Sequence, residues 1–344
     1  AILLIASLLF CSAVAAGELA DDVMEAANLQ GGLAVAVGCD DPELAADLAE
    51  RGYVVQTLDN DREKAAEARQ YFASTGVHGQ ATSLVLTGDR LPYVDNLVNL
   101  LVLGNGKIEI APAELDRVLA PRGVLVSESV ATSSNLVMHP MGDLFVYRKP
   151  VPDTIDDWPM HMYEPGNNAV SRDQLVGPPK HLRWRAGPSW TRSHEFASSL
   201  NAMVSMGGKL FYVMDEGSRL SPMLPEKWTL TCRDAFNGIV LWRCPLPSWH
   251  THWWPVKSGP TQAMRRLVAV GDKLYIPLGV GAPLSALDGA TGETVRTFEG
   301  TDGIEEIRIS EGTIYLLTSD AVAEQQTYNM STVEVWGAAG NATG

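Results

Sequence analysis

A short phrase that occurs twice in the second half of the chain constrains the fold most. Residues 232–242 and residues 286–296 share a small residue, an Asp two positions later, then Asn or Thr followed by Gly, and finally a β-rich run. Asp can accept a hydrogen bond from the backbone two residues further on, and Gly adopts the positive φ that a tight turn requires. The phrase therefore predicts one β-hairpin that is repeated.

A second repeat places an apolar and aromatic strand after a turn with glycine. Leu210, Leu274 and Ile314 are equivalent positions of this repeat, and they lie 64 and then 40 residues apart. The later interval is about the length of one four-stranded propeller blade. We therefore interpret the chain from about residue 170 onward as β-propeller blades. An ordinary β-sandwich with two similar hairpins is the alternative.

The first phrase resembles the tryptophan-docking repeat of the pyrroloquinoline-quinone-like (PQQ-like) propellers, which include quinoprotein dehydrogenases and propeller lipoproteins of outer-membrane assembly. Residues 286–296 match that repeat except that Arg296 stands in place of the Trp. Residues 232–242 keep Trp242 but begin with Cys232. The resemblance implies that the Trp packs between neighbouring blades, which indicates a fold but no chemistry.

Other stretches extend this resemblance to a subgroup of large extracytoplasmic propeller proteins, common in planctomycete-type bacteria, which also carry a methyltransferase-like segment. They are residues 156–158, 167–170, 176–179 and 249–255. The catalytic quinoprotein relatives use an adjacent cysteine pair, a calcium ion and an Asp base. Since the sequence has no adjacent cysteine pair, we do not expect PQQ as a cofactor.

The N-terminal half alternates between two patterns. Residues 33–37, 53–58, 97–103 and 124–126 are strand-like apolar runs, and residues 42–50 and 62–72 have helical spacing. Such alternation predicts a parallel sheet covered by helices, and hence a Rossmann-like α/β domain.

The order of features over about a hundred residues resembles a class I S-adenosylmethionine (SAM) methyltransferase core. Gly38 and Asp40 stand where that family has its glycine-rich first loop, and Asp59 stands where an acid holds the ribose hydroxyls. Asp95 lies in a segment that looks like the approach to the fourth strand, and residues 114–124 look like the helix and turn before the fifth. The resemblance implies that Gly38, Asp40, Asp59 and Asp95 would bind SAM.

The first loop departs from the family pattern. Successive glycines allow the backbone to approach a cofactor closely, but here Gly38 is followed by Cys39, two acids and Pro42. An acidic cluster suits the cationic sulfonium of SAM, so SAM remains a possible cofactor. We nevertheless interpret this domain as a degenerate methyltransferase relative that serves for packing or for binding another ligand.

Charge and the first residues indicate the compartment and the partners. Lys and Arg total 26 against 41 Asp and Glu, a formal charge of −15, so a nucleic-acid partner would be repelled.

Residues 1–16 form an apolar run with a small-residue ending, which we interpret as a truncated signal peptide. We expect a periplasmic or secreted protein without a transmembrane span in the mature chain. SAM is made in the cytoplasm, so this location argues against a working methyltransferase.

Two polar clusters are candidate binding sites in the second half. His250 and His252 would project from the same face of a strand and could bind one metal ion, with His194 or His161 as a third ligand. The alternative is that they hydrogen-bond to backbone among the neighbouring tryptophans. The loop of residues 156–168 could bind calcium or a sugar, or could simply link the domains.

The cysteines and the domain limits complete the expectations. Cys39, Cys232 and Cys244 are expected as small core residues, with a disulfide between Cys232 and Cys244 as a minor alternative. The predicted division is signal peptide 1–16, methyltransferase-like Rossmann domain 17–148, linker 149–170 and blades 171–344, with the propeller incomplete.

The predicted function is that of an extracytoplasmic, non-catalytic binding or scaffold protein for an unidentified protein or small-molecule ligand. A SAM-dependent methyltransferase is the alternative. A quinoprotein-like or metal-dependent propeller enzyme centred on His250 and His252 is the second alternative.

Overall fold

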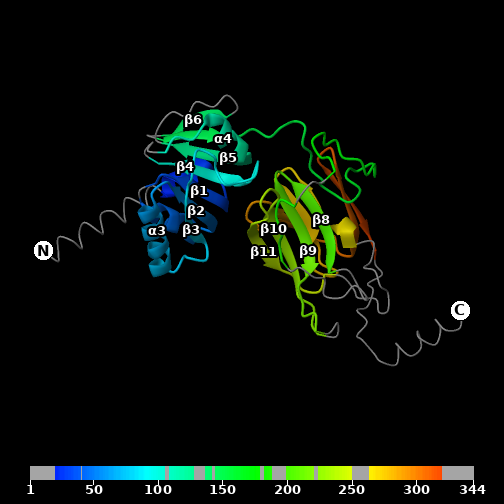
Figure 1. Cartoon of the computed structure of the whole chain (residues 1–344). Coiled ribbons are helices and arrows are strands. Elements are labelled where there is room, and N and C mark those ends of the chain that lie inside the picture. The colour runs from blue at the N-terminus through cyan, green and yellow to red at the C-terminus, as the bar shows by residue number, and fades with distance from the viewer. Residues whose placement is uncertain are drawn as a thin grey trace, which may run out of the picture. The chain divides into compact units, whose positions relative to one another are not determined.

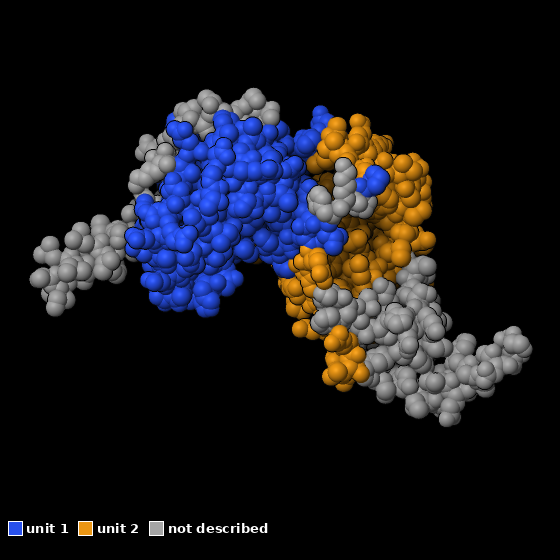
Figure 2. Space-filling view, viewed as in Figure 1, with its two compact units in different colours: residues 1–153, 178–184, 236–241 blue, residues 154–177, 185–235, 242–344 orange. Residues whose placement is uncertain are grey.

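The computed structural model describes most of the chain as two compact units (Figure 2). The described residues are 20–39, 41–104, 108–127, 136–141, 144–178, 182–187, 199–220, 224–249 and 263–319. Unit 1 comprises residues 1–153, 178–184 and 236–241, and unit 2 comprises residues 154–177, 185–235 and 242–344. The expected signal peptide lies outside the described residues.

Unit 1 contains a seven-stranded sheet with the order β3-β2-β1-β4-β5-β7-β6 (Figure 1). Its strands are β1 Gly32–Val37, β2 Tyr53–Asp59, β3 Ala81–Val85, β4 Val98–Leu103, β5 Leu119–Ser127, β6 Val137–Met141 and β7 Leu144–Arg148. Strands β1 to β5 are parallel, whereas β7 runs antiparallel to β5 and β6. The predicted parallel sheet is confirmed, and the β6–β7 hairpin is an addition that the sequence analysis did not predict.

Helices cover both faces of this sheet. They are α2 Pro42–Glu50, α3 Arg62–Thr75 and α4 Pro112–Val118, and residues 20–27 are also helical. Ala34 and Ala36 of β1 pack in the same cluster as the buried residues of α2 and Phe72 of α3, whereas Val35 and Val37 pack with α4. Because β1 is buried on both faces, its apolar run is continuous rather than alternating. This layered arrangement is a Rossmann-like α/β domain.

Aspartate side chains start the two helices that follow β1 and β2. The carboxylate of Asp41 accepts a hydrogen bond of 2.8 Å from the Glu43 amide at the start of α2. Asp61 accepts one of 2.8 Å from the Glu63 amide at the start of α3. These N-caps satisfy amide groups that a helix leaves without intrahelical partners. They fix where each helix begins relative to the strand before it.

Unit 2 is built from antiparallel sheets. Two have four strands, with the orders β11-β10-β9-β8 and β12-β13-β14-β15, and the third is the pair β16-β17. The strands are β8 Leu200–Met206, β9 Lys209–Asp215, β10 Trp228–Asp234, β11 Val240–Pro245, β12 Val268–Val270, β13 Lys273–Pro277, β14 Leu284–Asp288, β15 Thr294–Phe298, β16 Ile304–Ser310 and β17 Thr313–Thr318. The 3-10 helix η1, Ala263–Arg266, precedes β12.

Both sequence repeats correspond to repeated structure. The phrase at 232–242 spans the end of β10 and the start of β11, and its copy at 286–296 spans β14 and β15. In the copy, Asp288 accepts hydrogen bonds from the amides of Ala290 and Thr291, and Gly292 has a φ of +77°. The second repeat is also confirmed, because Leu210, Leu274 and Ile314 each occupy the second position of a strand that follows a two-residue turn.

The first strands of the three sheets are neighbours, since β12 contacts both β8 and β16. The segment 158–160 lies against them: the carbonyl of Trp158 accepts from the Ser205 amide, and that of Pro159 accepts from the Ala269 amide. Met160 is buried in the core shared by β12, β14 and β16. Within the described residues these sheets do not close into a propeller or a barrel, so the complete propeller fold is not established.

Candidate functional site

The carboxyl ends of β1 and β4 mark the place where unit 1 can bind a ligand. The chain proceeds from β1 to β2 and β3 on one side, then crosses to β4 and β5 on the other. In open α/β sheets, ligands bind beyond the carboxyl ends of the strands at such a change of direction. Gly38 follows β1, Gly104 follows β4, and Asp59 is the last residue of β2. We call Gly38, Cys39, Asp59 and Gly104 the carboxyl edge.

Two glycines bring the loops after β1 and β4 into direct contact. The Gly104 amide donates a hydrogen bond of 2.9 Å to the carbonyl of Val37, and the Gly38 amide donates one of 2.9 Å to the carbonyl of Leu58. A Cβ atom on Gly104 would overlap the carbonyl oxygen of Gly38 and lie 2.9 Å from the Cys39 nitrogen. Gly38 itself has a φ of +64°, a left-handed conformation that favours glycine. Both positions therefore require glycine.

Sequence reasoning identified Gly38 but missed Gly104. The available signal was a glycine directly after the apolar run that forms β4. That signal gains meaning only when the ends of β1 and β4 are known to be adjacent.

Asp59 presents a carboxylate beside this contact. Its Oδ1 accepts a hydrogen bond of 2.8 Å from the Asp61 amide, which holds the β2–α3 turn. Within the described part of the chain, its Oδ2 has no hydrogen-bond donor. The side chain is half-buried, so Oδ2 can accept from a ligand. The bond between the Gly38 amide and the Leu58 carbonyl keeps this carboxylate next to the glycine loop.

Carboxylates crowd the start of α2, close to the carboxyl edge. Burial raises the pKa of Glu43, and the neighbouring Asp41 and Asp47 raise it further. Burial likewise raises the pKa of Asp47. At the N-terminus of α2 the Asp41 carboxylate already accepts from the Glu43 amide and Pro42 has no amide hydrogen, so fewer amides are offered to a phosphate there. This surface favours a cation and disfavours a phosphorylated ligand.

The structure places the other predicted cofactor residues differently. Asp40 lies outside the described residues. Asp95 precedes β4, so it lies at the amino edge of the parallel sheet, opposite to Gly38 and Asp59. There it is exposed and forms an ion pair of 2.8 Å with Arg117. Its hydrogen bond with Arg117 lowers the pKa of Asp95. The structure does not bring Asp95 together with the other two residues.

The predicted metal ligands are mostly beyond what the structure covers. His250, His252 and His194 lie outside the described residues. Burial lowers the pKa of His161, and Arg265 and Arg308 lower it further. Among the described residues, no group of three His, Cys, Asp or Glu side chains could hold a metal ion.

In the loop that follows unit 1, residues 156–172, polar groups hydrogen-bond to one another. Oδ2 of Asp156 accepts hydrogen bonds of 2.7 Å from the Tyr163 hydroxyl and 2.7 Å from the Arg172 amide. The ring centroids of Trp158 and Tyr163 lie 5.4 Å apart. The Asp156 carboxylate and the two rings thus stabilise the loop itself, which accounts for the composition that suggested calcium or a sugar.

The described cysteines form no disulfide with one another. Cys232 is fully buried on β10, as expected of a core residue, and burial raises the pKa of its thiol to about 12. Cys39 is half-buried and packs at the margin of the unit 1 core, whereas Cys244 is half-buried on β11 and does not belong to the core shared by β12, β14 and β16. Separately, no helix in the described ranges is long and apolar enough to cross a membrane.

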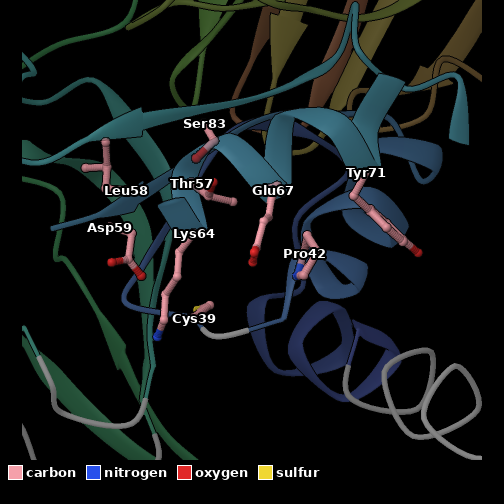
Figure 3. A pocket seen from close by; sticks show the side chains of 10 residues that line it. Cys39, Pro42, Thr57, Leu58, Asp59, Lys64, Glu67, Tyr71 and Ser83 are labelled. Carbon is pink, nitrogen blue, oxygen red and sulfur yellow. The ribbon is translucent and has the colours of Figure 1, made fainter. Parts of the chain in front are cut away.

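A cavity of about 210 Å³ lies beside the carboxyl edge, under helix α3 (Figure 3). We call it the α3 cavity. It is lined by Cys39, Pro42, Thr57, Leu58, Asp59, Lys64, Glu67, Ala68, Tyr71 and Ser83. Asp59 and Cys39 therefore belong to both the carboxyl edge and the wall of the cavity.

Comparisons with known proteins found similarity to solved structures only. No family model matches the chain, and no curated protein matches it. A putative SAM-dependent methyltransferase from Methanococcus maripaludis is 13% identical with a TM-score of 0.35, over 40% of this chain and 87% of that one.

Two further structures match over shorter fractions of their length. A putative sarcosine dimethylglycine methyltransferase from Galdieria sulphuraria is 16% identical with a TM-score of 0.31, over 33% of this chain and 46% of that one. Geranyl diphosphate C-methyltransferase from Streptomyces coelicolor, solved with S-adenosyl-L-homocysteine, is 15% identical with a TM-score of 0.30, over 32% and 44%. The chain thus spans less than half the length of these two proteins.

These findings correct the predicted main function. All three structures are named as methyltransferases, and no family model of a PQQ-like repeat matches the chain. The expectation of a non-catalytic binding or scaffold protein is therefore wrong, and the alternative of a SAM-dependent methyltransferase is left as a proposal. With identities of 13–16% and TM-scores of 0.30–0.35, this likeness assigns no activity.

Proposed function

We propose that unit 1 binds SAM at the carboxyl edge and that the protein is a SAM-dependent methyltransferase. One observation carries the proposal. The Asp59 carboxylate stands at the end of β2, beside the contact of Gly38 with Gly104, and Oδ2 is available to a ligand. An acid at this place in a Rossmann-like domain accepts hydrogen bonds from the hydroxyls of a ribose.

The residues present fit SAM better than a dinucleotide. Asp59 would accept from the ribose hydroxyls, and the Gly38 and Gly104 backbones would allow the rest of the molecule to approach the sheet. SAM carries a cationic sulfonium and no phosphate, which agrees with the carboxylates of Asp41 and Glu43 and with a helix N-terminus that is already capped. A pyrophosphate would be repelled there by the carboxylates of Asp41 and Glu43.

When bound, SAM supplies an electrophilic methyl group. The role of this chain's residues is to hold and orient, since a transfer of this kind depends on the alignment of the reacting atoms. Asp59 would fix the ribose, and the two glycines would fix the depth at which the ligand lies. Substitution of Asp59 or of either glycine is therefore expected to weaken SAM binding first, and to affect the methyl-transfer step only through the position of SAM.

The binding part of the proposal is tested by calorimetric titration of the purified chain with SAM and with S-adenosyl-L-homocysteine. We expect saturable binding that weakens at least tenfold in Asp59→Asn, because the amide loses the charge but can keep the bond from the Asp61 amide. Asp95→Asn is the matched control and should bind as the original chain does. Absence of heat with both compounds at millimolar concentration from folded protein would overturn the proposal.

The catalytic part needs a separate readout. Transfer of a labelled methyl group from SAM to small-molecule and protein acceptors should be detectable with the original chain and reduced in Asp59→Asn. Binding without transfer to any acceptor would leave unit 1 as a SAM-binding domain and would contradict the methyltransferase assignment.

We also propose that the sheets of unit 2 are successive blades of a propeller of PQQ-like type. Two observations support this: β12 contacts both β8 and β16, and Trp242 of one sheet contacts the β14–β15 turn of the next. Both are expected of sheets that fan out from their first strands. An experimental structure in which these sheets pack face to face as a sandwich would contradict the proposal.

A further inference from the structure

Two buried hydroxyl groups lie on the floor of the α3 cavity. Thr57 is 8% exposed and Ser83 is 1% exposed, and both line the cavity. Within the described ranges, neither Thr57 Oγ1 nor Ser83 Oγ has a hydrogen-bond partner. A buried hydroxyl without a partner costs folding free energy. Two of them in one cavity indicate a place where a polar ligand completes the structure.

The sheet register brings the two hydroxyls side by side. Thr57 of β2 and Ser83 of β3 are paired residues of adjacent parallel strands, which lie about 4.8 Å apart. The residues that precede them on the same face are apolar: Tyr53 and Val55 on β2, and Ala81 on β3. The apolar columns of both strands thus become polar at the same level of the sheet, under α3.

The mouth of the cavity carries more negative than positive charge. Asp59 from β2 and Glu67 from α3 are lining carboxylates, and Lys64 is the lining ammonium group. In Figure 3 the side chains of Thr57, Lys64, Glu67 and Pro42 surround a common space, and Tyr71 extends away from it.

The outer wall lies in the same negative surroundings. Burial raises the pKa of the Tyr71 hydroxyl, and the carboxylates of Glu43, Asp41, Asp47 and Glu50 raise it further. A cation that enters here is attracted, and an anion is repelled.

We infer that the α3 cavity binds a small primary alkylammonium ion. An ammonium group has three N–H donors, which suit the Thr57 hydroxyl, the Ser83 hydroxyl and the Glu67 carboxylate. The alkyl part would lie against Ala68 and Pro42. At about 210 Å³ the cavity is smaller than the roughly 300–1,000 Å³ of sites for drug-sized ligands, which limits the ligand to a few carbon atoms.

This inference goes beyond the proposed function, because the hydroxyls of Thr57 and Ser83 lie on the cavity floor under α3 and not at the carboxyl edge. It also does not depend on SAM.

The test is a titration of the purified chain with ethylammonium chloride at constant ionic strength, followed by calorimetry and by amide NMR shifts. We expect saturable binding with shifts centred on β2, β3 and α3. Thr57→Val and Ser83→Ala should each weaken it at least tenfold, and Glu67→Gln several-fold. Thr82→Val is the matched control, because Thr82 lies on β3 but is exposed, and it should bind as the original chain does.

Two other probes define the chemistry. Ethanol has the same size without the charge, and potassium chloride has the charge without the N–H donors and the alkyl group. Equal binding of ethanol would overturn the cationic assignment, and equal binding of potassium would overturn the alkylammonium assignment. Equal, non-saturable responses in the original chain and in Ser83→Ala would overturn the site itself.

The same variants separate this inference from the proposed function. SAM titrations of Thr57→Val and Ser83→Ala should match those of the original chain. If SAM fails to bind while ethylammonium binds and depends on Ser83, only the proposed function falls. If SAM binds and ethylammonium does not, only the present inference falls.

Discussion

The indole ring of Trp242, on β11, lies directly on Gly292, in the turn between β14 and β15. A Cβ atom on Gly292 would be 2.7 Å from two atoms of that ring, and the Trp242 Nε1 donates a hydrogen bond of 3.3 Å to the carbonyl of Gly289. The same ring contacts Phe211 of β9 at a centroid distance of 6.0 Å. One side chain therefore joins the first four-stranded sheet of unit 2 to the hairpin turn of the second.

Gly292→Ala is expected to destabilise unit 2 by about 2–5 kcal/mol. The strain of an L-residue at φ +77° costs about 1–2 kcal/mol, and the collision with the Trp242 ring adds about 1–3 kcal/mol. Gly271→Ala is the control, since Gly271 has a φ of +71° and open space around its Cβ position. Urea unfolding should show a loss of only about 1 kcal/mol for the control. Equal losses would show that the ring contact contributes nothing.

Gly104→Ala is expected to separate the loops after β1 and β4. The added Cβ would meet the backbone of Gly38 and Cys39, which cannot rotate away, so we expect a loss of stability of about 1–3 kcal/mol and weaker SAM binding. Gly79→Ala has open space and no positive φ, so it should be neutral or slightly stabilising. Thermal unfolding with and without SAM measures both effects. A Gly104→Ala chain that matches Gly79→Ala in both readouts would contradict the close approach.

Much of unit 1 could be predicted from the sequence because its central strands are buried on both faces. The apolar runs at β1 and β4 are local signals of buried strands, and the structure bears them out. The aspartates that cap α2 and α3 are also local signals, which the sequence analysis did not use. The repeated hairpins of unit 2 were equally visible, because Asp and Gly determine a turn within a few residues.

The rest depends on contacts that are distant in sequence. Gly104 meets Gly38 only because the chain crosses the sheet between β3 and β4, and Thr57 meets Ser83 only through the register of β2 with β3. Asp95 was assigned to the cofactor by resemblance, but it pairs with Arg117 at the other edge of the sheet. Closure of a propeller likewise depends on how whole sheets assemble, which no single repeat specifies.

The stability of unit 1 is expected to fall in acid through Glu114. Its Oε1 accepts hydrogen bonds of 2.7 Å from the Leu91 amide and 2.7 Å from Arg117, and the bond with Arg117 is the main reason that the pKa of Glu114 lies below its ordinary value of 4.5. The carboxylate therefore stabilises the folded state fully above about pH 4.5, and this contribution is lost as the pH falls through the lowered pKa.

Glu114→Gln should remove this dependence and cost about 2 kcal/mol at pH 7, the value of a hydrogen bond to a charged group. Urea unfolding of both chains between pH 7 and pH 3.5 measures the difference, which should shrink towards the acid end. A difference that stays constant with pH would show that the Glu114 charge does not contribute.

The thiols of unit 2 should differ in reactivity. Cys232 is fully buried and its pKa is raised to about 12, so it is neither accessible nor ionised at neutral pH. Cys244 is partly exposed and should be alkylated by iodoacetamide in the folded protein. Peptide mass spectrometry after brief labelling should find Cys244 modified and Cys232 unmodified, with both modified after unfolding in urea. Rapid labelling of Cys232 in folded protein would contradict its place in the core.

Thr57→Val is expected to stabilise the ligand-free protein by about 1 kcal/mol, even though most substitutions in a core are destabilising. The Thr57 hydroxyl is buried in the described structure without a hydrogen-bond partner, and replacing it by a methyl group removes the desolvation cost while nearly keeping the volume. Thr301→Val is the comparison, because Thr301 Oγ1 accepts a hydrogen bond of 2.9 Å from the Leu284 amide and donates one of 2.6 Å to the Phe298 carbonyl; it should be destabilising. Urea unfolding of both variants without added amine measures the two effects. A clear loss of stability in Thr57→Val would show that this hydroxyl already has a partner, such as a bound water molecule, when the cavity holds no ligand.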